Sequence, residues 1–283
     1  MSLLRTRIPL KVLFGYRFRY LLRLIGNGFR SRTILFYPGY PSHKTLIFKI
    51  CRTRGYNITT DLHRSCDLAF AWENTTWRPE YPELRDTAAH VRVLNRECRD
   101  ISKSHLADVF AQVFGYPLAL DPTVHEGKCV EKADRNATKS GQVVTCPLPA
   151  PEPECCYQRL INNVTEEGLL EELRIPVIGG RIPLLFFKHK PQENRFFSGW
   201  LTVAVREPDD LLTDVEQEQI GEFCRRFGLD WGEIDVLRDF DDGRIYIVDA
   251  NNTPWGPSRD LPESERRALV RRLAQVFEET FLE

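Results

Sequence analysis

The segment 232–254 (GEIDVLRDFDDGRIYIVDANNTP) constrains the fold most. Two apolar runs flank Asp242-Gly243, a dipeptide typical of the tight turn between antiparallel strands. Asp235 lies in the first run, and Asp249 and Asn251 lie two positions apart in the second, so both point to one face of a strand. Turn chemistry explains acidic residues at the turn itself, but an unpaired carboxylate within a buried strand is costly. Carboxylate and amide oxygens suit Mg²⁺, so we predict that Asp235, Asp249 and Asn251 hold a metal ion.

The remaining patterns indicate strands mixed with helices. Segment 173–190 predicts a second hairpin around Gly179-Gly180. Segment 101–115 predicts a helix that ends at Gly115, and segment 212–230 predicts a helix with a Thr213 cap that ends at Gly228. Further strands are expected in 32–41, 67–72, 128–144 and 155–161, a helix in 262–283, and either a helix or a strand in 45–59. Strands that alternate with helical segments over about 30–95 predict a small α/β layer.

Charge is unevenly distributed along the 283 residues. Lys and Arg total 39 and Asp and Glu total 40, yet residues 1–60 contain twelve basic residues and no acidic one. A basic, aromatic-rich start fits either a docking arm for an anionic membrane or an acidic partner, or a first helix packed on the domain. We favour the packed helix. No zinc-finger or RNA-binding signature accompanies it, so we expect no nucleic-acid partner.

Composition excludes several classes of protein. Apolar residues make up 42 % of the chain, which is enough for a substantial core. No run approaches the ~18–20 apolar residues of a membrane span, and arginines interrupt the apolar start, which argues against a signal peptide. We therefore expect a cytoplasmic protein whose eight cysteines are reduced thiols. Their spacing does not match a zinc site.

The hairpin segment resembles the metal-binding hairpin of the ATP-grasp superfamily, with matches at Asp235, Asp249, Asn251 and Pro254. The resemblance implies an α+β fold, in which two ATP-grasp lobes clasp ATP behind a small N-terminal α/β domain, with ATP and Mg²⁺ as cofactors. We expect three parts: the basic segment and α/β domain in 1–90, the lobe with the phosphate-binding lysine and hinge strand in 91–165, and the lobe with the metal hairpin in 166–283.

Other segments resemble ATP-grasp motifs in the family's order. The resemblance implies nucleotide-binding roles for residues of a helix start, of a strand and of the hinge strand, together with one lysine of the second hairpin: Lys103, Lys132, Gln158, Arg159, Leu160, Ile161 and Lys188. It also implies that Arg174, Lys188 and Arg195 act in catalysis, facing the phosphates or a bound acid.

The implied activity is that of a biosynthetic carboxylate–amine ligase. In such enzymes ATP phosphorylates a carboxylate, and an amine then attacks the acyl phosphate to form an amide or peptide bond. Glu233 stands where D-alanine ligases carry the arginine that stabilises the oxyanion, so Arg174 or Arg195 would take that role. Two alternatives stay open: a kinase that phosphorylates a small-molecule hydroxyl, and a nucleotide-binding scaffold that docks through its basic N-terminus.

Overall fold

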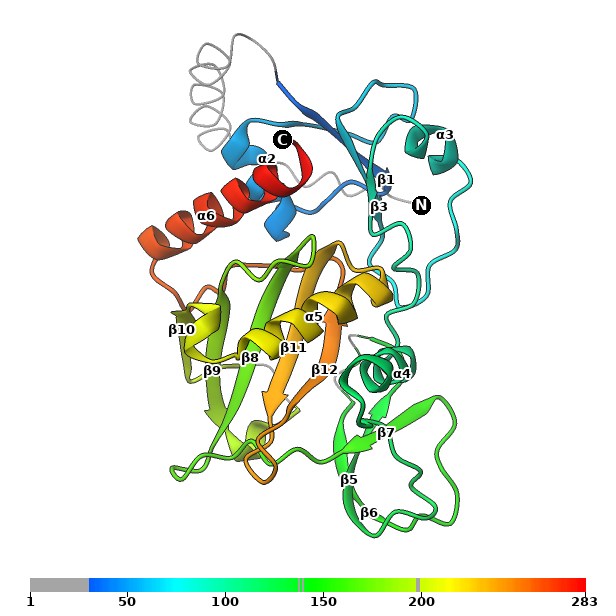
Figure 1. The fold of residues 1–283 in the computed structure, drawn as a ribbon, viewed down its shortest axis with the longest axis vertical. Helices are drawn as coiled ribbons and strands as arrows, with labels where there is room; N and C mark the ends of the chain where they lie inside the picture. The colour runs from blue at the N-terminus through cyan, green and yellow to red at the C-terminus, as the bar shows by residue number, and fades with distance from the viewer. Residues whose placement is uncertain (1–30, 137, 139, 197–198) are drawn as a thin grey trace, which may run out of the picture.

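The computed structural model describes residues 31–136, 138, 140–196 and 199–283, and these form three β-sheets with helices packed on them (Figure 1). The expected helix in the basic N-terminal segment falls largely in 1–30 and lies outside the described residues. Helices and strands are mixed throughout, which confirms the expected α+β class. No helix in the described part of the chain is long and apolar enough to cross a membrane.

The first sheet is parallel and has the strand order β2-β1-β3-β4. Its strands are β1 (Thr33–Pro38), β2 (Asn57–Thr59), β3 (Leu68–Trp72) and β4 (Val93–Leu94), with α2 (Leu46–Arg54) and α3 (Leu84–Ala88) between them. Segment 45–59, which fits a helix or a strand, contains both, because Gly55 in the left-handed conformation (φ 75°) ends α2 and turns the chain into β2.

Helix α6 (Glu263–Phe281) completes the core of this first sheet (Figure 1). Its fully buried Leu273 and Phe277 share a hydrophobic cluster with Ile34 and Phe70, and the Phe70 and Phe277 rings stack with centroids 6.3 Å apart. The C-terminal helix therefore shares a core with the N-terminal sheet, although it follows the five-stranded sheet in sequence.

The second sheet has three antiparallel strands in the order β6-β5-β7. They are β5 (Gly127–Ala133), β6 (Gln142–Cys146) and β7 (Cys155–Arg159), and α4 (Lys103–Phe114) precedes them. The Ser102 hydroxyl accepts a hydrogen bond from the His105 amide and caps α4, so Lys103 is the first helical residue.

The third sheet has five antiparallel strands in the order β10-β9-β8-β11-β12. They are β8 (Leu169–Ile178), β9 (Leu185–Pro191), β10 (Thr202–Arg206), β11 (Trp231–Arg238) and β12 (Ile245–Asn251). Both predicted hairpins are confirmed, because β8 pairs with β9 and β11 pairs with β12. Short 3₁₀ turns, η1 (Gln192–Asn194) and η2 (Pro208–Asp210), flank β10.

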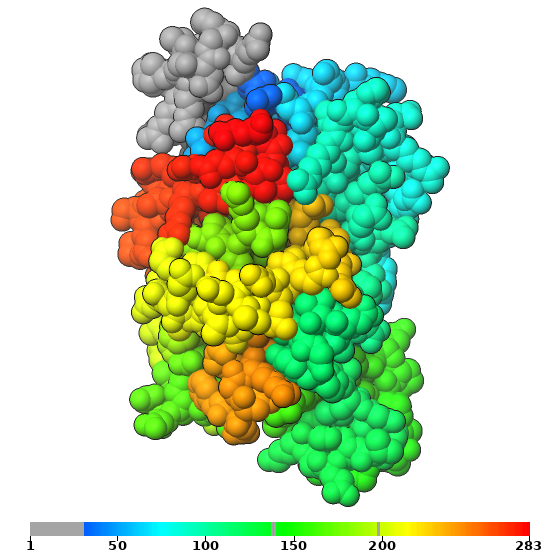
Figure 2. Space-filling model, in the orientation of Figure 1, coloured from blue at the N-terminus to red at the C-terminus, as the bar shows by residue number. Residues whose placement is uncertain are grey.

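The two faces of the five-stranded sheet differ in polarity. One face packs against helices: its Ile175, Val177 and Ile234 share a hydrophobic cluster with residues of α4 and of α5 (Asp214–Phe227). Figure 2 shows α5 on this side of the molecule. Because side chains alternate along a strand, the residues between them face the other way. That opposite face carries the polar residues from which the candidate site is built.

Candidate active site

The predicted metal ligands converge at the β11–β12 pair. Asp235 and Asp249 are register partners on neighbouring strands, brought opposite each other by a shift in register between Asp235 and Val236. Asp249 Oδ1 is buried and has no hydrogen-bond partner among the described residues; it lies 3.8 Å from Lys103 Nζ. Asn251 ends β12, and its Oδ1 accepts a hydrogen bond from the Thr253 amide at 2.9 Å.

Electrostatics around Asp249 favour a cation. Burial raises the pKa of Asp249, and the nearby Asp235 carboxylate raises it further, while Lys103 opposes the shift. A carboxylate oxygen that is buried without a hydrogen-bond partner gains from a cation that binds it. Within the described residues, no group of three or more His, Cys, Asp or Glu side chains could hold a metal ion. Any metal here would therefore rest on the Asp235–Asp249 pair with an amide or water oxygen.

Arg174 forms the closest ion pair of the site. It lies on β8 in register with Asp235, and its Nε and Nη2 donate to the two Asp235 carboxylate oxygens at 2.6 and 2.8 Å. Burial alone would raise the pKa of Asp235, but the Arg174 guanidinium holds it below its usual value. Arg174 Nη2 also lies 3.7 Å from Glu172 Oε1. The guanidinium thus neutralises part of the acidic charge on this face.

Lys188 of β9 lies beside the acidic residues Glu172 and Asp235. Its Nζ is 3.9 Å from Glu172 Oε1 and 4.6 Å from the centre of the Trp200 ring. Burial and the neighbouring Arg174 lower the pKa of Lys188. Burial, followed by the Asp235 charge, raises the pKa of Glu172 to about 7. Basic and acidic groups therefore alternate across β8, β9 and β11 on one face of the sheet.

Lys132 reaches the site from the other lobe. It lies on β5, and its Nζ donates to Gln158 Oε1 on β7 at 3.0 Å. Burial lowers the pKa of Lys132, an effect that Asp249 opposes and Lys103 strengthens. Lys103 and Lys132 thus lie close enough to Asp249 to interact with its charge. Three predicted site residues from separate elements meet in this way between the two sheets.

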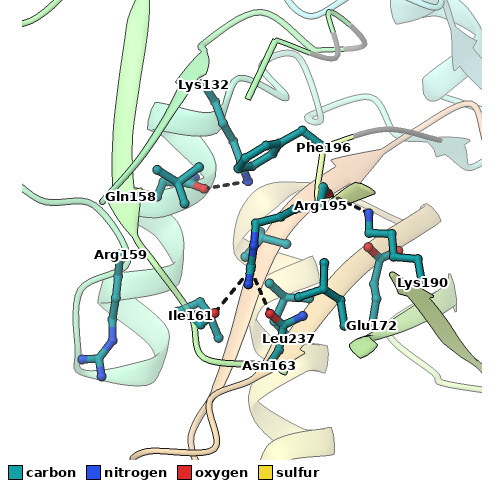
Figure 3. A pocket seen from close by; sticks show the side chains of 13 residues that line it. Lys132, Gln158, Arg159, Ile161, Asn163, Glu172, Lys190, Arg195, Phe196 and Leu237 are labelled. Carbon is teal, nitrogen blue, oxygen red and sulfur yellow. Dashed lines mark hydrogen bonds between the residues drawn. The ribbon is translucent and has the colours of Figure 1, made fainter. Parts of the chain in front are cut away.

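A small cavity of about 90 Å³ lies between the lobes (Figure 3). Lys132, Gln158, Ile161 and Arg195 line it, and Arg195 Nη1 donates to Asn163 Oδ1 at 3.0 Å. Gln158 Nε2 is buried without a hydrogen-bond partner among the described residues. Ligand pockets usually have ~300–1,000 Å³, so a nucleotide would have to displace the side chains that fill this space, such as Arg195 and Phe196.

Of the other two predicted hinge residues, Arg159 lines this cavity and Leu160 is not among its lining residues. Arg159 is exposed, and its guanidinium pairs with Asp239 at 3.1 Å and Asp242 at 3.2 Å, near the turn of the metal hairpin. Figure 3 shows Arg159 directed away from Lys132 and Arg195. Leu160 is half-buried. The structure therefore brings Gln158 and Ile161 toward Lys132 and ties Arg159 to the hairpin turn.

Two residues that the sequence patterns did not single out belong to this region. Lys190 is buried, and its Nζ donates to the Arg195 carbonyl at 2.7 Å. Trp200 lies against both lysines of β9, 4.6 Å from Lys188 Nζ and 4.7 Å from Lys190 Nζ. The i, i+2 spacing of Lys188 and Lys190 is a signal that could have identified Lys190, since it puts both on one face of a strand.

The chain is similar in fold to solved ligase structures. No family model and no curated protein matches its sequence. D-alanine–D-alanine ligase from Bacillus anthracis complexed with ATP has 12 % identity and a TM-score of 0.54, over 88 % of this chain and 97 % of that one. VanG D-Ala:D-Ser ligase from Enterococcus faecalis has 10 % identity and a TM-score of 0.55, over 89 % and 100 %. The ATP-grasp ligase PsnB, complexed with a phosphomimetic precursor variant, Mg and ADP, has 12 % identity and a TM-score of 0.54, over 89 % and 99 %. The chain therefore has the ATP-grasp fold, as its hairpin predicts.

Proposed function

We propose that this protein is an ATP-dependent carboxylate–amine ligase. The observation that carries the proposal is the Asp235–Asp249 pair, which is set opposite Lys103 and Lys132 of the other lobe and beside Arg174. A pair of carboxylates facing several cations between two lobes suits the triphosphate of a nucleotide with its metal ion. The similar folds of ligases solved with ATP, or with Mg and ADP, support the same assignment.

The residues present fit Mg²⁺. Asp249 offers a buried oxygen without a hydrogen-bond partner, Asp235 faces it across the strands, and Asn251 supplies an amide oxygen at the end of β12. When bound there, Mg²⁺ would neutralise charge on the phosphate oxygens. Arg174 already holds Asp235 with two hydrogen bonds, so it would share this carboxylate with the metal.

The chain's cations would bind and align the phosphates. In our proposal Lys103 and Lys132 contact the phosphates, Gln158 and Ile161 lie against the base, and Arg159 and Leu160 flank the hinge. Phosphoryl transfer depends mostly on alignment and charge neutralisation. Lys188, whose pKa burial lowers, lies near the acidic face of β8 and β11 and gains from an added anion. Arg195 would release Asn163 and turn to the nucleotide.

The reaction itself proceeds in two displacements. An oxygen of the acid attacks the γ-phosphorus, and ADP leaves with the bonding electrons. The amine nitrogen then attacks the acyl carbon, the amide bond forms, and phosphate leaves while the nitrogen loses a proton. Arg174 uses only two donor atoms on Asp235, so its remaining N–H groups can hold the acyl oxygen as negative charge develops there.

Trapping with hydroxylamine tests the chemistry. ADP release is first screened against pooled amino acids, small acids and sugars. With an active acid present and the amine omitted, hydroxylamine should intercept the acyl phosphate and give a hydroxamate. A stable phosphorylated product, formed once per ADP and without hydroxamate, would establish a kinase on the same scaffold instead. No ADP release with any pool would favour the nucleotide-binding scaffold.

A further inference from the structure

A second and larger cavity, of about 550 Å³, opens beside the candidate active site. Its walls come from α2 and the loop before it, from the polar face of β8, β9 and β11, and from the segment that leads into α6. Its volume lies within the ~300–1,000 Å³ usual for ligand pockets. Arg174 and Lys188 line one side, so the cavity is continuous with the residues that we place at the reacting groups.

The lining of this cavity is strongly basic. Glu233 is the only acidic residue among the described lining residues. Six of them are Lys or Arg: Lys44, Lys49, Arg174, Lys188, Arg259 and Arg266. Arg174 and Lys188 have carboxylate neighbours in Asp235 and Glu172. By contrast, Lys49, Arg259 and Arg266 have no carboxylate within ion-pair distance in the described part of the chain. The charge excess is therefore concentrated at the side away from β8.

The three cations without a carboxylate partner lie close enough to repel one another. After burial, the positive charges of Arg266 and Arg259 are the main causes that lower the pKa of Lys49. Lys49 Nζ donates to the Lys44 carbonyl at 3.2 Å and to the Gly256 carbonyl, both of which are uncharged acceptors. Arg266 Nε is buried and has no hydrogen-bond partner among the described residues. Buried cationic donors of this kind are costly unless an anion binds them.

The undescribed residues cannot supply that anion. Residues 1–30 contain no Asp or Glu, and positions 137, 139, 197 and 198 are Ala, Lys, Phe and Ser. Glu233 is the only carboxylate among the described lining residues, and it also interacts with Arg174 and Lys188, so an anion from outside the chain can bind Lys49, Arg259 and Arg266. Trp200 and Trp255 also line the cavity and provide apolar surface for the body of a ligand.

We infer that the acid activated by this protein carries a second anionic group, a carboxylate or a phosphate ester, that Lys49, Arg259 and Arg266 bind. Its reacting carboxylate would lie at Arg174 and Lys188, an assignment that rests on the proposed ligase function. Glu233 lies between the two groups of cations, since its carboxylate interacts with Arg174 and Lys188 and also with Lys49. It would separate the two anionic ends of the substrate.

Calorimetric titration of matched compounds tests this inference directly. The full chain with Mg·ADP is titrated with L-glutamate against L-glutamine, L-aspartate against L-asparagine, and O-phospho-L-serine against L-serine. In at least one pair, we expect the compound with the additional anionic group to bind at least ~10-fold more tightly than the compound without it, as charge-assisted hydrogen bonds allow. The first two pairs report a second carboxylate and the third reports a phosphate.

Charge-neutral variants locate the effect. Arg259→Gln and Arg266→Gln should each reduce the preference for the anionic member of a pair by ~10-fold. Arg259 is exposed, so its replacement should not disturb folding. Arg271→Gln is the matched control, because it removes the same charge from an exposed position of α6 outside the cavity lining and should keep the preference. Lack of an anionic preference in every pair, or its persistence in both cavity variants, would overturn the inference.

ADP release separates this inference from the proposed function. If no acid stimulates ADP release but the charge-dependent binding is lost in the cavity variants, the ligase function fails and the anion site stands. If acids without a second anionic group drive ADP release with the same KM in the wild type and both variants, the ligase function stands and the substrate class is wrong. If the inference holds, KM for the acid rises while kcat stays close to that of the wild type, because these cations bind substrate and transition state alike.

Discussion

Replacing Arg174 with alanine should destabilise the protein as well as stop catalysis. The change leaves the Asp235 carboxylate, whose side chain is 16 % exposed, without either hydrogen bond and near Glu172. Breaking a buried ion pair costs about 3–5 kcal/mol. Because the Arg174 side chain keeps 34 % of its surface exposed, water can partly replace it, and we expect about 2–4 kcal/mol. In a chain of this size that lowers the thermal midpoint by about 5–12 °C.

Arg174→Lys separates the two effects. Lysine keeps the positive charge but forms one contact with Asp235 instead of two, so about 1 kcal/mol of stability is lost, or roughly 2–4 °C. Turnover should nevertheless fall ~10²–10³-fold, because the guanidinium donors to the acyl oxygen are gone. Thermal unfolding without nucleotide and hydroxamate formation provide the two readouts.

The Asp235→Asn change then tests the cause of the instability. Added to Arg174→Ala, it should recover part of the lost midpoint, because an unpaired buried amide costs less than an unpaired buried carboxylate. If Arg174→Ala unfolds at the wild-type temperature, the argument from the buried ion pair is wrong. If Arg174→Lys keeps wild-type turnover, Arg174 is not the oxyanion donor.

Three further predictions address single groups. Asp249→Asn should lower ATP turnover at least ~10²-fold without lowering the nucleotide-free thermal midpoint, because Oδ1 has no hydrogen bond to lose. Asp108→Asn, at an exposed position of α4, is the control. Equal turnover in the two variants would remove Asp249 from the site. Lys132→Ala should weaken ATP binding by about 1–3 kcal/mol in a direct titration, whereas a matching loss of nucleotide-free stability would make Lys132 structural. Burial raises the pKa of Glu172 from an ordinary 4.5 to about 7. The folded state therefore binds a proton at Glu172 more readily than the unfolded state, and the wild type should gain stability as pH falls from 8 to 5. In thermal melts without Mg²⁺, Glu172→Gln should flatten this dependence of stability on pH, and an unchanged dependence would contradict the raised pKa.

The β11–β12 hairpin could be predicted from sequence because its turn signal is local. Asp242-Gly243 indicates the turn, and the alternation of side chains along β12 puts Asp249 and Asn251 on one face. Asp235 lies opposite Asp249 only because the register shifts between Asp235 and Val236, an irregularity that the alternating pattern does not predict. The Thr213 cap of α5 is equally local and is also confirmed, and Glu216 completes it as a capping box. Turns and caps of this kind can be predicted without knowledge of the rest of the chain, whereas the register shift beside Asp235 cannot.

The partners of the site residues depend on contacts between distant segments. Arg174 meets Asp235 only because β8 pairs with β11, two strands that are not consecutive in the chain. Arg159 is likewise drawn to Asp239 and Asp242 by the approach of the hinge strand to the hairpin turn. Strand β10 was not predicted, because it is a short edge strand whose pairing with β9 provides much of its order.

The packing of α6 on the first sheet has a consequence for biosynthesis. Ribosomes complete β1 and β3 long before Leu273 and Phe277, so the cluster that contains Ile34 and Phe70 lacks its α6 residues in the meantime. At ~5–20 residues per second, about 10–40 s separate Phe70 from Phe277. During that interval the nascent chain exposes an apolar surface that chaperones can bind. The N-terminal sheet reaches its final packing only after the three-stranded and five-stranded sheets have been synthesised.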